Sequence, residues 1–150
     1  MTKQKLRDEL KQSMLARNEL RTSVLRMLLS AINYYEINKG GAGYEATDED
    51  VLSVISSQAK QRKDSIAEFE KAQRMELVDK EKKELEILQA FLPEQMSDDE
   101  VKKIVEQTIT ETGVKSMQDM GKLMGALNVK LKGKADMGMV SNLVKRALTS

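Results

Sequence analysis

The residues best suited to chemistry lie near the end of the chain, in the segment Lys130-Leu131-Lys132-Gly133-Lys134-Ala135-Asp136. Three lysines flank a glycine at a turn between two expected helices. Ammonium groups, free backbone amides and the positive end of a helix dipole together favour the binding of a phosphate group. The alternative is a glycine helix end with incidental lysines. The segment therefore predicts either a phosphate-binding corner or an ordinary turn.

A second feature is the pair Gly121 and Gly125, four residues apart on one expected helix. Each glycine in a helix interior costs about 1 kcal/mol relative to alanine. Either the pair lets a neighbouring helix approach closely, or it leaves a smooth face on which a nucleic-acid backbone can lie. The candidate nucleic-acid-binding residues are Lys122, Lys130, Lys132, Lys134, Gly121, Gly125 and Gly133.

Arg62 is the third feature, because it interrupts the apolar stripe of a helix expected over residues 48–71. A buried guanidinium without a partner would be costly. Either Arg62 pairs with an acid from a neighbouring helix, or Arg62 and Lys63 line a groove.

The composition excludes much other chemistry. The 150 residues contain no Cys and no His, so disulfides, thiol nucleophiles, Ser-His-Asp catalysis and zinc sites built on His or Cys are excluded. No Walker A or GxGxxG sequence is present, and no pair of acids can be singled out for acid/base catalysis. We expect no catalytic residue, no cofactor and no metal.

The net charge of +1 is unevenly distributed. Lys and Arg outnumber Asp and Glu by 8 to 4 in residues 1–39, and by 7 to 2 in residues 115–150. Residues 44–111 have 10 basic side chains against 18 acidic ones. The basic C-terminal segment favours a polyanionic partner, the alternative being a lysine-rich solvated surface.

The elements that position these residues are all expected to be helices, since no sustained alternation predicts a strand. Thr2 can cap a first helix, and a second helix ends at the glycines of residues 40–43. Thr47 can cap the helix over 48–71. A fourth helix begins after a break near Gln73 and ends at Leu92-Pro93, because the residue before proline disfavours helical geometry.

Pro93 is the expected boundary between two domains. Ser97 and Glu100 form a capping-box pattern directly after it. Three short helices should follow, the first ending at Gly113, the second capped by Ser116 and the third capped by Asp136. The apolar stripe of the second is expected to be Met117, Met120, Met124, Leu127 and Leu131. The sequence thus predicts an all-α protein, with an N-terminal helical domain (1–92) followed by a small C-terminal three-helix bundle (93–150).

Several segments together resemble the YqeY-like family over nearly the whole chain, in order and with suitable spacing. They are Leu20–Leu28 (LRTSVLRML), Lys60–Ile66 (KQRKDSI), Phe91–Gln95 (FLPEQ), Asp119–Gly125 (DMGKLMG) and Lys132–Asp136 (KGKAD). The resemblance implies a C-terminal domain similar to the tail of the B subunit (GatB) of tRNA-dependent amidotransferase. That tail is a tRNA-contacting appendage without the phosphate-activating chemistry of the enzyme.

The resemblance therefore implies a tRNA-binding accessory module without catalysis of its own. One alternative is an amidotransferase-like component, a carbon–nitrogen ligase with glutamine as amido-N-donor that acts on aminoacyl-tRNA. A second alternative is a helical protein–protein adaptor. The expected partners are tRNA and an aminoacyl-tRNA-related enzyme. No signal-peptide or membrane-spanning pattern is found, so we expect a cytoplasmic protein that does not enter a membrane.

Overall fold

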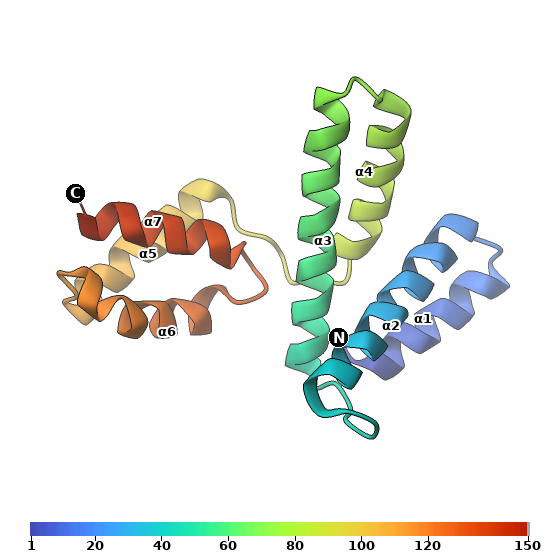
Figure 1. The fold of residues 1–150 in the computed structure, drawn as a ribbon, viewed down its shortest axis with the longest axis horizontal. Helices are drawn as coiled ribbons and strands as arrows, with labels where there is room; N and C mark the ends of the chain where they lie inside the picture. Colours follow the sequence, from blue (N-terminus) through green and yellow to red (C-terminus); the bar gives the residue numbers. More distant parts are fainter. Residues whose placement is uncertain (150) are drawn as a thin grey trace. The chain divides into compact units, whose positions relative to one another are not determined.

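The computed structural model describes residues 1–149, and every regular element in them is helical (Figure 1). The all-α prediction is confirmed for this part of the chain. The elements are α1 (Lys3–Leu15), α2 (Glu19–Gly40), α3 (Asp48–Lys71), α4 (Met75–Gln89), α5 (Asp98–Thr112), the 3₁₀ turn η1 (Met117–Asp119), α6 (Met120–Leu131) and α7 (Met137–Thr149).

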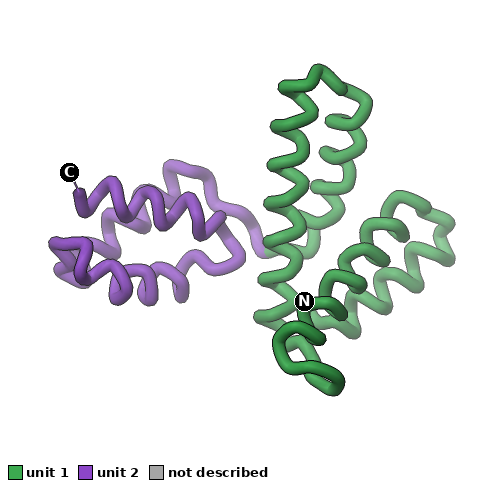
Figure 2. The backbone as a smooth tube through the Cα atoms, viewed as in Figure 1, with its two compact units in different colours: residues 1–92 green, residues 93–150 purple. Residues whose placement is uncertain are grey.

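The chain divides into two compact units, coloured separately in Figure 2: unit 1 covers residues 1–92 and unit 2 begins at Pro93. In unit 1, α1 packs on α2, α3 packs on α4, and α2 also contacts both α3 and α4. In unit 2, each of α5, α6 and α7 packs on the other two. Independent folding of the two units stays a prediction.

Thr2, Thr47 and Ser97 cap helices as expected, but Ser116 does not. The Ser116 side chain makes no capping hydrogen bond, because the residues that follow it form the 3₁₀ turn η1 and α6 begins only at Met120. The Thr2 hydroxyl accepts a hydrogen bond from the Lys5 amide at 3.0 Å. Thr47 opens α3 in a capping box with Asp50. Ser97 opens α5 in the same way, its amide donating to Glu100 Oε2 at 2.9 Å and its hydroxyl accepting from the Glu100 amide at 3.3 Å. These side chains satisfy backbone amides that have no partner within the helix.

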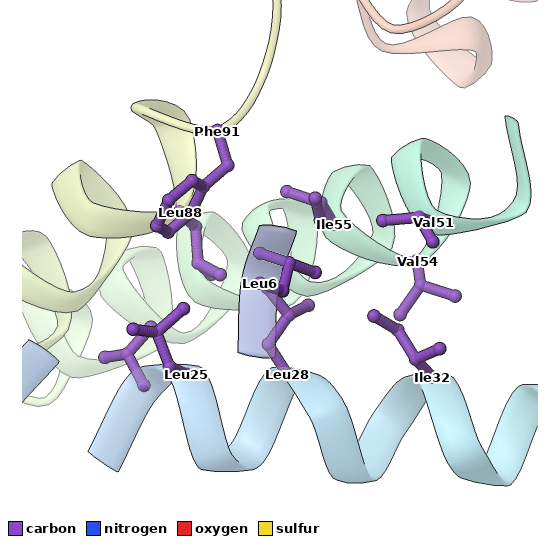
Figure 3. Close-up of a cluster of buried hydrophobic side chains, with 10 residues drawn as sticks. Leu6, Leu25, Leu28, Ile32, Val51, Val54, Ile55, Leu88 and Phe91 are labelled. Carbon is purple, nitrogen blue, oxygen red and sulfur yellow. The ribbon is translucent and has the colours of Figure 1, made fainter. Parts of the chain in front are cut away.

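Unit 1 is built around one buried apolar cluster, drawn in Figure 3. Leu25, Leu28 and Ile32 lie at helical spacing along α2, opposite side chains of α3 and the end of α4. Helical steps of three and four residues place such side chains on one face. The buried members are Leu6, Val24, Leu25, Leu28, Ile32, Val51, Val54, Ile55, Leu88 and Phe91.

Unit 2 has a core of its own, and one sequence expectation fails there in part. Leu123, Leu127 and Leu131 are the buried residues of α6, whereas Met117 is exposed and Met124 is only partly buried. The expectation is correct for Met120, Met124, Leu127 and Leu131, which all belong to the core or pack against it, but it omitted Leu123. It was wrong for Met117, because the chain from Met117 to Asp119 forms a 3₁₀ turn and the α-helical periodicity begins only at Met120. The buried members are Val101, Val105, Val114, Leu123, Leu127, Leu131, Val140 and Val144.

Candidate nucleic-acid interface

The two glycines of α6 lie on an open surface. Gly121 and Gly125 are both exposed, and a Cβ atom added at either position would meet no heavy atom within 4 Å. Close helix–helix approach therefore does not explain them, at least within the described residues. The two glycines leave a surface on which the helix backbone is accessible.

Helical geometry places further exposed residues beside this pair. At about 100° per residue, positions 128, 129 and 132 fall on the same side of α6 as the two glycines. Val129 is 87% exposed, and Asn128 and Lys132 are also exposed. We call Gly121, Gly125, Asn128, Val129 and Lys132 the glycine face. The buried leucines of α6 project from the opposite side.

Lys122 borders the glycine face and is exposed. Lys130, by contrast, lies on the side of α6 away from the glycine face and reaches back to α5. Its Nζ donates to Glu111 Oε2 at 2.9 Å and to Thr108 Oγ1 at 3.2 Å. Lys130 therefore already has an anionic partner within unit 2, whereas Lys122 lies beside the glycine face.

The turn after α6 is held by the segment that follows Pro93. Gln95 Nε2 donates to the Gly133 carbonyl at 2.7 Å, and the Met96 amide donates to the Lys134 carbonyl at 2.9 Å. Gly133 has a φ of 79°, a left-handed conformation that glycine adopts without steric cost. These bonds fix the turn that carries Lys132 and the exposed Lys134.

The N-terminus of α7 is already capped by a carboxylate of the chain itself. Asp136 Oδ1 accepts a hydrogen bond from the Gly138 amide at 2.9 Å, so a carboxylate occupies the place that the phosphate-binding corner would offer to a ligand. This geometry favours the ordinary capped turn over the phosphate-binding corner. The lysines near the turn therefore contribute positive charge rather than parts of a preformed phosphate-binding site.

Arg62 has acidic partners on α4. Its Nη1 lies 3.0 Å from Glu81 Oε2 and forms a second ion pair with Glu84, while Nη2 lies 3.7 Å from the sulfur of Met27. Glu84 is buried, so the pairing compensates the burial of both charges. Arg62 therefore follows the first alternative, pairing with a neighbouring helix. Lys63 next to it is exposed.

The sequence analysis missed a polar cluster around Asp50, at the junction of α2 and α3. Its carboxylate accepts hydrogen bonds from Lys39 Nζ at 2.8 Å, Tyr44 Oη at 2.6 Å and Tyr35 Oη at 2.8 Å. The Lys39 bond, followed by those from Tyr44, the Thr47 amide and Tyr35, holds the pKa of Asp50 well below its usual range. The cluster closes the loop between the two helices.

Glu36 makes a similar link nearby. It accepts a hydrogen bond from Lys3 Nζ at 2.8 Å and one from the Ala46 amide at 2.8 Å. These bonds, the Lys3 bond first, lower the pKa of Glu36. Glu36 continues the buried face of α2 four residues after Ile32, and an acid on that apolar stripe was the sequence signal that could have identified it. Both acids stabilise unit 1 and neither lies in unit 2.

No helix among residues 1–149 is long and apolar enough to cross a membrane. In the same part of the chain, no three acidic side chains are grouped so that they could hold a metal ion.

Comparison with known proteins gives a consistent family. The family model described as "Yqey-like protein" matches residues 3–148. An uncharacterized protein of Schizosaccharomyces pombe is 39% identical over 92 residues, which cover 61% of this chain and 72% of the relative. "Altered inheritance of mitochondria protein 41, mitochondrial" of Saccharomyces cerevisiae is 35% identical over 132 residues, 83% of this chain and 69% of the relative.

A relative with the same printed name in Vanderwaltozyma polyspora is 28% identical over 145 residues, 93% of this chain and 77% of its own length. Two of these three relatives are thus named as mitochondrial proteins, which contradicts the expectation of a cytoplasmic protein. That expectation was wrong because it took the lack of a signal-peptide or membrane pattern as evidence for one compartment. The family match spans nearly all of the chain, which therefore belongs to the YqeY-like family.

Proposed function

We propose that the chain is a tRNA-binding accessory module without catalysis of its own, and that unit 2 contacts the RNA through the glycine face of α6 and the lysines beside it. The observation that carries the proposal is the open space around Gly121 and Gly125. Gly125, in the helix interior, weakens α6 by about 1 kcal/mol and Gly121, in its first turn, by less, and no neighbouring atom among the described residues needs the room at either position.

Gly121 and Gly125 suit a nucleic-acid backbone because no side chain at these two positions holds a bulky ligand away from the helix. Phosphate contacts position a protein on RNA without reading base sequence. Folded RNA is recognised largely by shape and by contacts to phosphates and 2′-hydroxyls. The similarity of unit 2 to the amidotransferase tail supports tRNA as the RNA in question.

The lysines make unequal contributions in this proposal. Lys122 borders the face and is exposed, and Lys132 lies on it. Lys134 projects from the fixed turn that follows. Lys130 is held by Glu111, and exposed ion pairs of this kind are worth only about 0.2–1 kcal/mol, so a phosphate can compete for it. We expect Lys122 to contribute most.

The test is a titration of folded tRNA with the full chain by fluorescence anisotropy at several salt concentrations. Log affinity should fall linearly with log salt, and the slope should shrink by about 0.7–0.9 for each phosphate contact removed. Lys122→Glu should lower both the affinity and this slope. Preference among tRNA sequences should be weak, because lysine recognises charge rather than base edges.

The matched control is Lys145→Glu, which makes the same charge change in unit 2 but on α7. Lys145 is exposed, so neither substitution disturbs the core. If the control lowers affinity as much as Lys122→Glu does, the attraction is a general charge effect and the proposed contact face is wrong. An absence of binding even at low salt would refute RNA binding and favour the protein–protein adaptor.

A further inference from the structure

Unit 1 has an unpartnered groove at the end of the α1–α2 hairpin, far along the chain from the glycine face. It has a volume of about 630 Å³, and its lining includes Met14, Arg17, Glu19, Ser23, Arg26 and Met27. Met14 is 50% exposed and Met27 is 49% exposed, and Leu15 beside Met14 is 71% exposed. Two large apolar side chains, Met14 and Met27, therefore line the groove and are open to solvent, and Leu15 is exposed next to Met14 in the chain.

The groove also carries more positive than negative charge, since two arginines and one glutamate line it. Among the described residues, neither Arg17 nor Arg26 makes a salt bridge within 4.0 Å, although Arg26 Nη2 lies 4.0 Å from the sulfur of Met14. Other acids of these helices are already engaged, since Glu9 pairs with Arg21 and Glu36 with Lys3. Glu19 is the one carboxylate that lines the groove.

We propose that this groove, which we call the Met–Arg groove, docks an amphipathic helix of a partner protein whose apolar stripe is flanked by Asp or Glu. Methionine is flexible and polarisable, and methionine-lined surfaces accept helices by burying an apolar stripe. The two arginines then pair with the flanking acids, which fixes orientation more than it adds affinity. The proposal goes beyond RNA binding and does not depend on it.

Two other occupants fit the groove less well. A phosphate backbone could pair with the two arginines but would gain nothing from the exposed methionines. An extended peptide that adds to a sheet edge is not favoured, since residues 1–149 contain helices and no sheet. The walls are the end of α1 and the start of α2, so an apolar groove between helices fits a third helix best.

The test uses the full chain with ¹³C-methyl-labelled methionine and a synthetic helical peptide that has leucines at helical spacing flanked by glutamates. The methyl signals of Met14 and Met27 are assigned by Met→Leu substitution. Both signals should shift saturably with this peptide, whereas Met75, exposed on α4, should not. A peptide with lysines in place of the glutamates should bind about tenfold more weakly or worse.

Matched variants distinguish binding of the peptide in the Met–Arg groove from nonspecific hydrophobic binding elsewhere on the surface. Met27→Glu and Arg26→Glu should each weaken binding of the acidic peptide about tenfold, the loss usual for a central interface residue. Met75→Glu, an equally exposed methionine outside the groove, should leave the affinity unchanged. Circular dichroism of each variant checks that the helices persist.

Four results would each overturn the proposal. They are the absence of a saturable shift at Met14 and Met27, equal binding of the lysine peptide, a shift of these two signals by tRNA alone, and a concentration-dependent shift without any peptide. The third result would make the groove an RNA contact, and the fourth an interface between copies of this chain.

Discussion

Replacing Gly125 by alanine should stabilise unit 2 and weaken tRNA binding at the same time. Gly125 lies in the interior of α6, and an added Cβ meets nothing within 4 Å. The full difference in helix propensity, about 0.8–1.0 kcal/mol, should therefore appear as a higher free energy of unfolding. For a unit of this size, 1 kcal/mol corresponds to a rise in Tm of about 4–8 °C. Gly121 is the second residue of α6, so its replacement should give a smaller gain.

The effect on binding has the opposite sign. If an RNA backbone lies on the glycine face, a new methyl group at position 125 is forced into the contact. Overpacking of a close contact costs about 1 kcal/mol or more, which is at least about a fivefold loss of affinity. Differential scanning calorimetry and fluorescence anisotropy of the same preparations measure the two effects separately.

A second helix-stabilising substitution, placed away from the glycine face, serves as the control. Asn142 is exposed on α7, and its replacement by alanine should also raise helix stability by a few tenths of a kcal/mol. Asn142→Ala should leave the affinity for tRNA unchanged. If Gly125→Ala stabilises unit 2 without lowering the affinity, RNA does not use the glycine face. If it destabilises unit 2, the inference of open space at Gly125 is itself wrong.

Four further predictions follow from particular contacts. Ser97→Ala should lower the stability of unit 2 by about 1 kcal/mol through loss of the helix cap, measured by urea unfolding. A fragment beginning at Pro93 should unfold cooperatively by circular dichroism, and a fragment unfolded on its own would show that the two units are one domain. Asp50 has a lowered pKa in the folded chain, so its stabilising contribution is present above the unfolded-state pKa of about 3.9 and is lost as pH falls below it. The Tm difference between wild type and Asp50→Asn should accordingly shrink in acid, and a constant difference would contradict this assignment. The isolated chain should not form amide product from misacylated tRNA, glutamine, ATP and Mg²⁺, and turnover above a protein-free control would favour the amidotransferase-like alternative.

Local chemistry made much of the fold predictable. Thr2, Thr47 and Ser97 each combine a hydroxyl with a following helical pattern, and each caps a helix in the structure. Gly113 ends α5 in a left-handed conformation, as expected for glycine after a helix. Such signals depend on residues within a few positions of one another. They could therefore be recognised without knowing which helices meet.

Contacts between distant segments could not be predicted in the same way. The partners of Arg62 lie on α4, and nothing in the pattern of α3 indicates whether Glu81, Glu84 or another acid faces it. The Asp50 cluster joins side chains from α2, the following loop and α3. The pairing of Lys130 with Glu111 likewise depends on how α5 and α6 cross. Each case needs the packing of helices, which a single sequence does not specify.

The glycine face shows why packing matters more than propensity in α6. A helix of 12 residues with two glycines would be marginal in water by itself. Leu123, Leu127 and Leu131 are fully buried and bind α6 to the core of unit 2. Because this buried side stabilises the helix, the opposite side does not need good helix formers. The residues there can be selected for what approaches from outside, and exposed glycines beside a lysine fit the close approach of a charged backbone better than they fit stability.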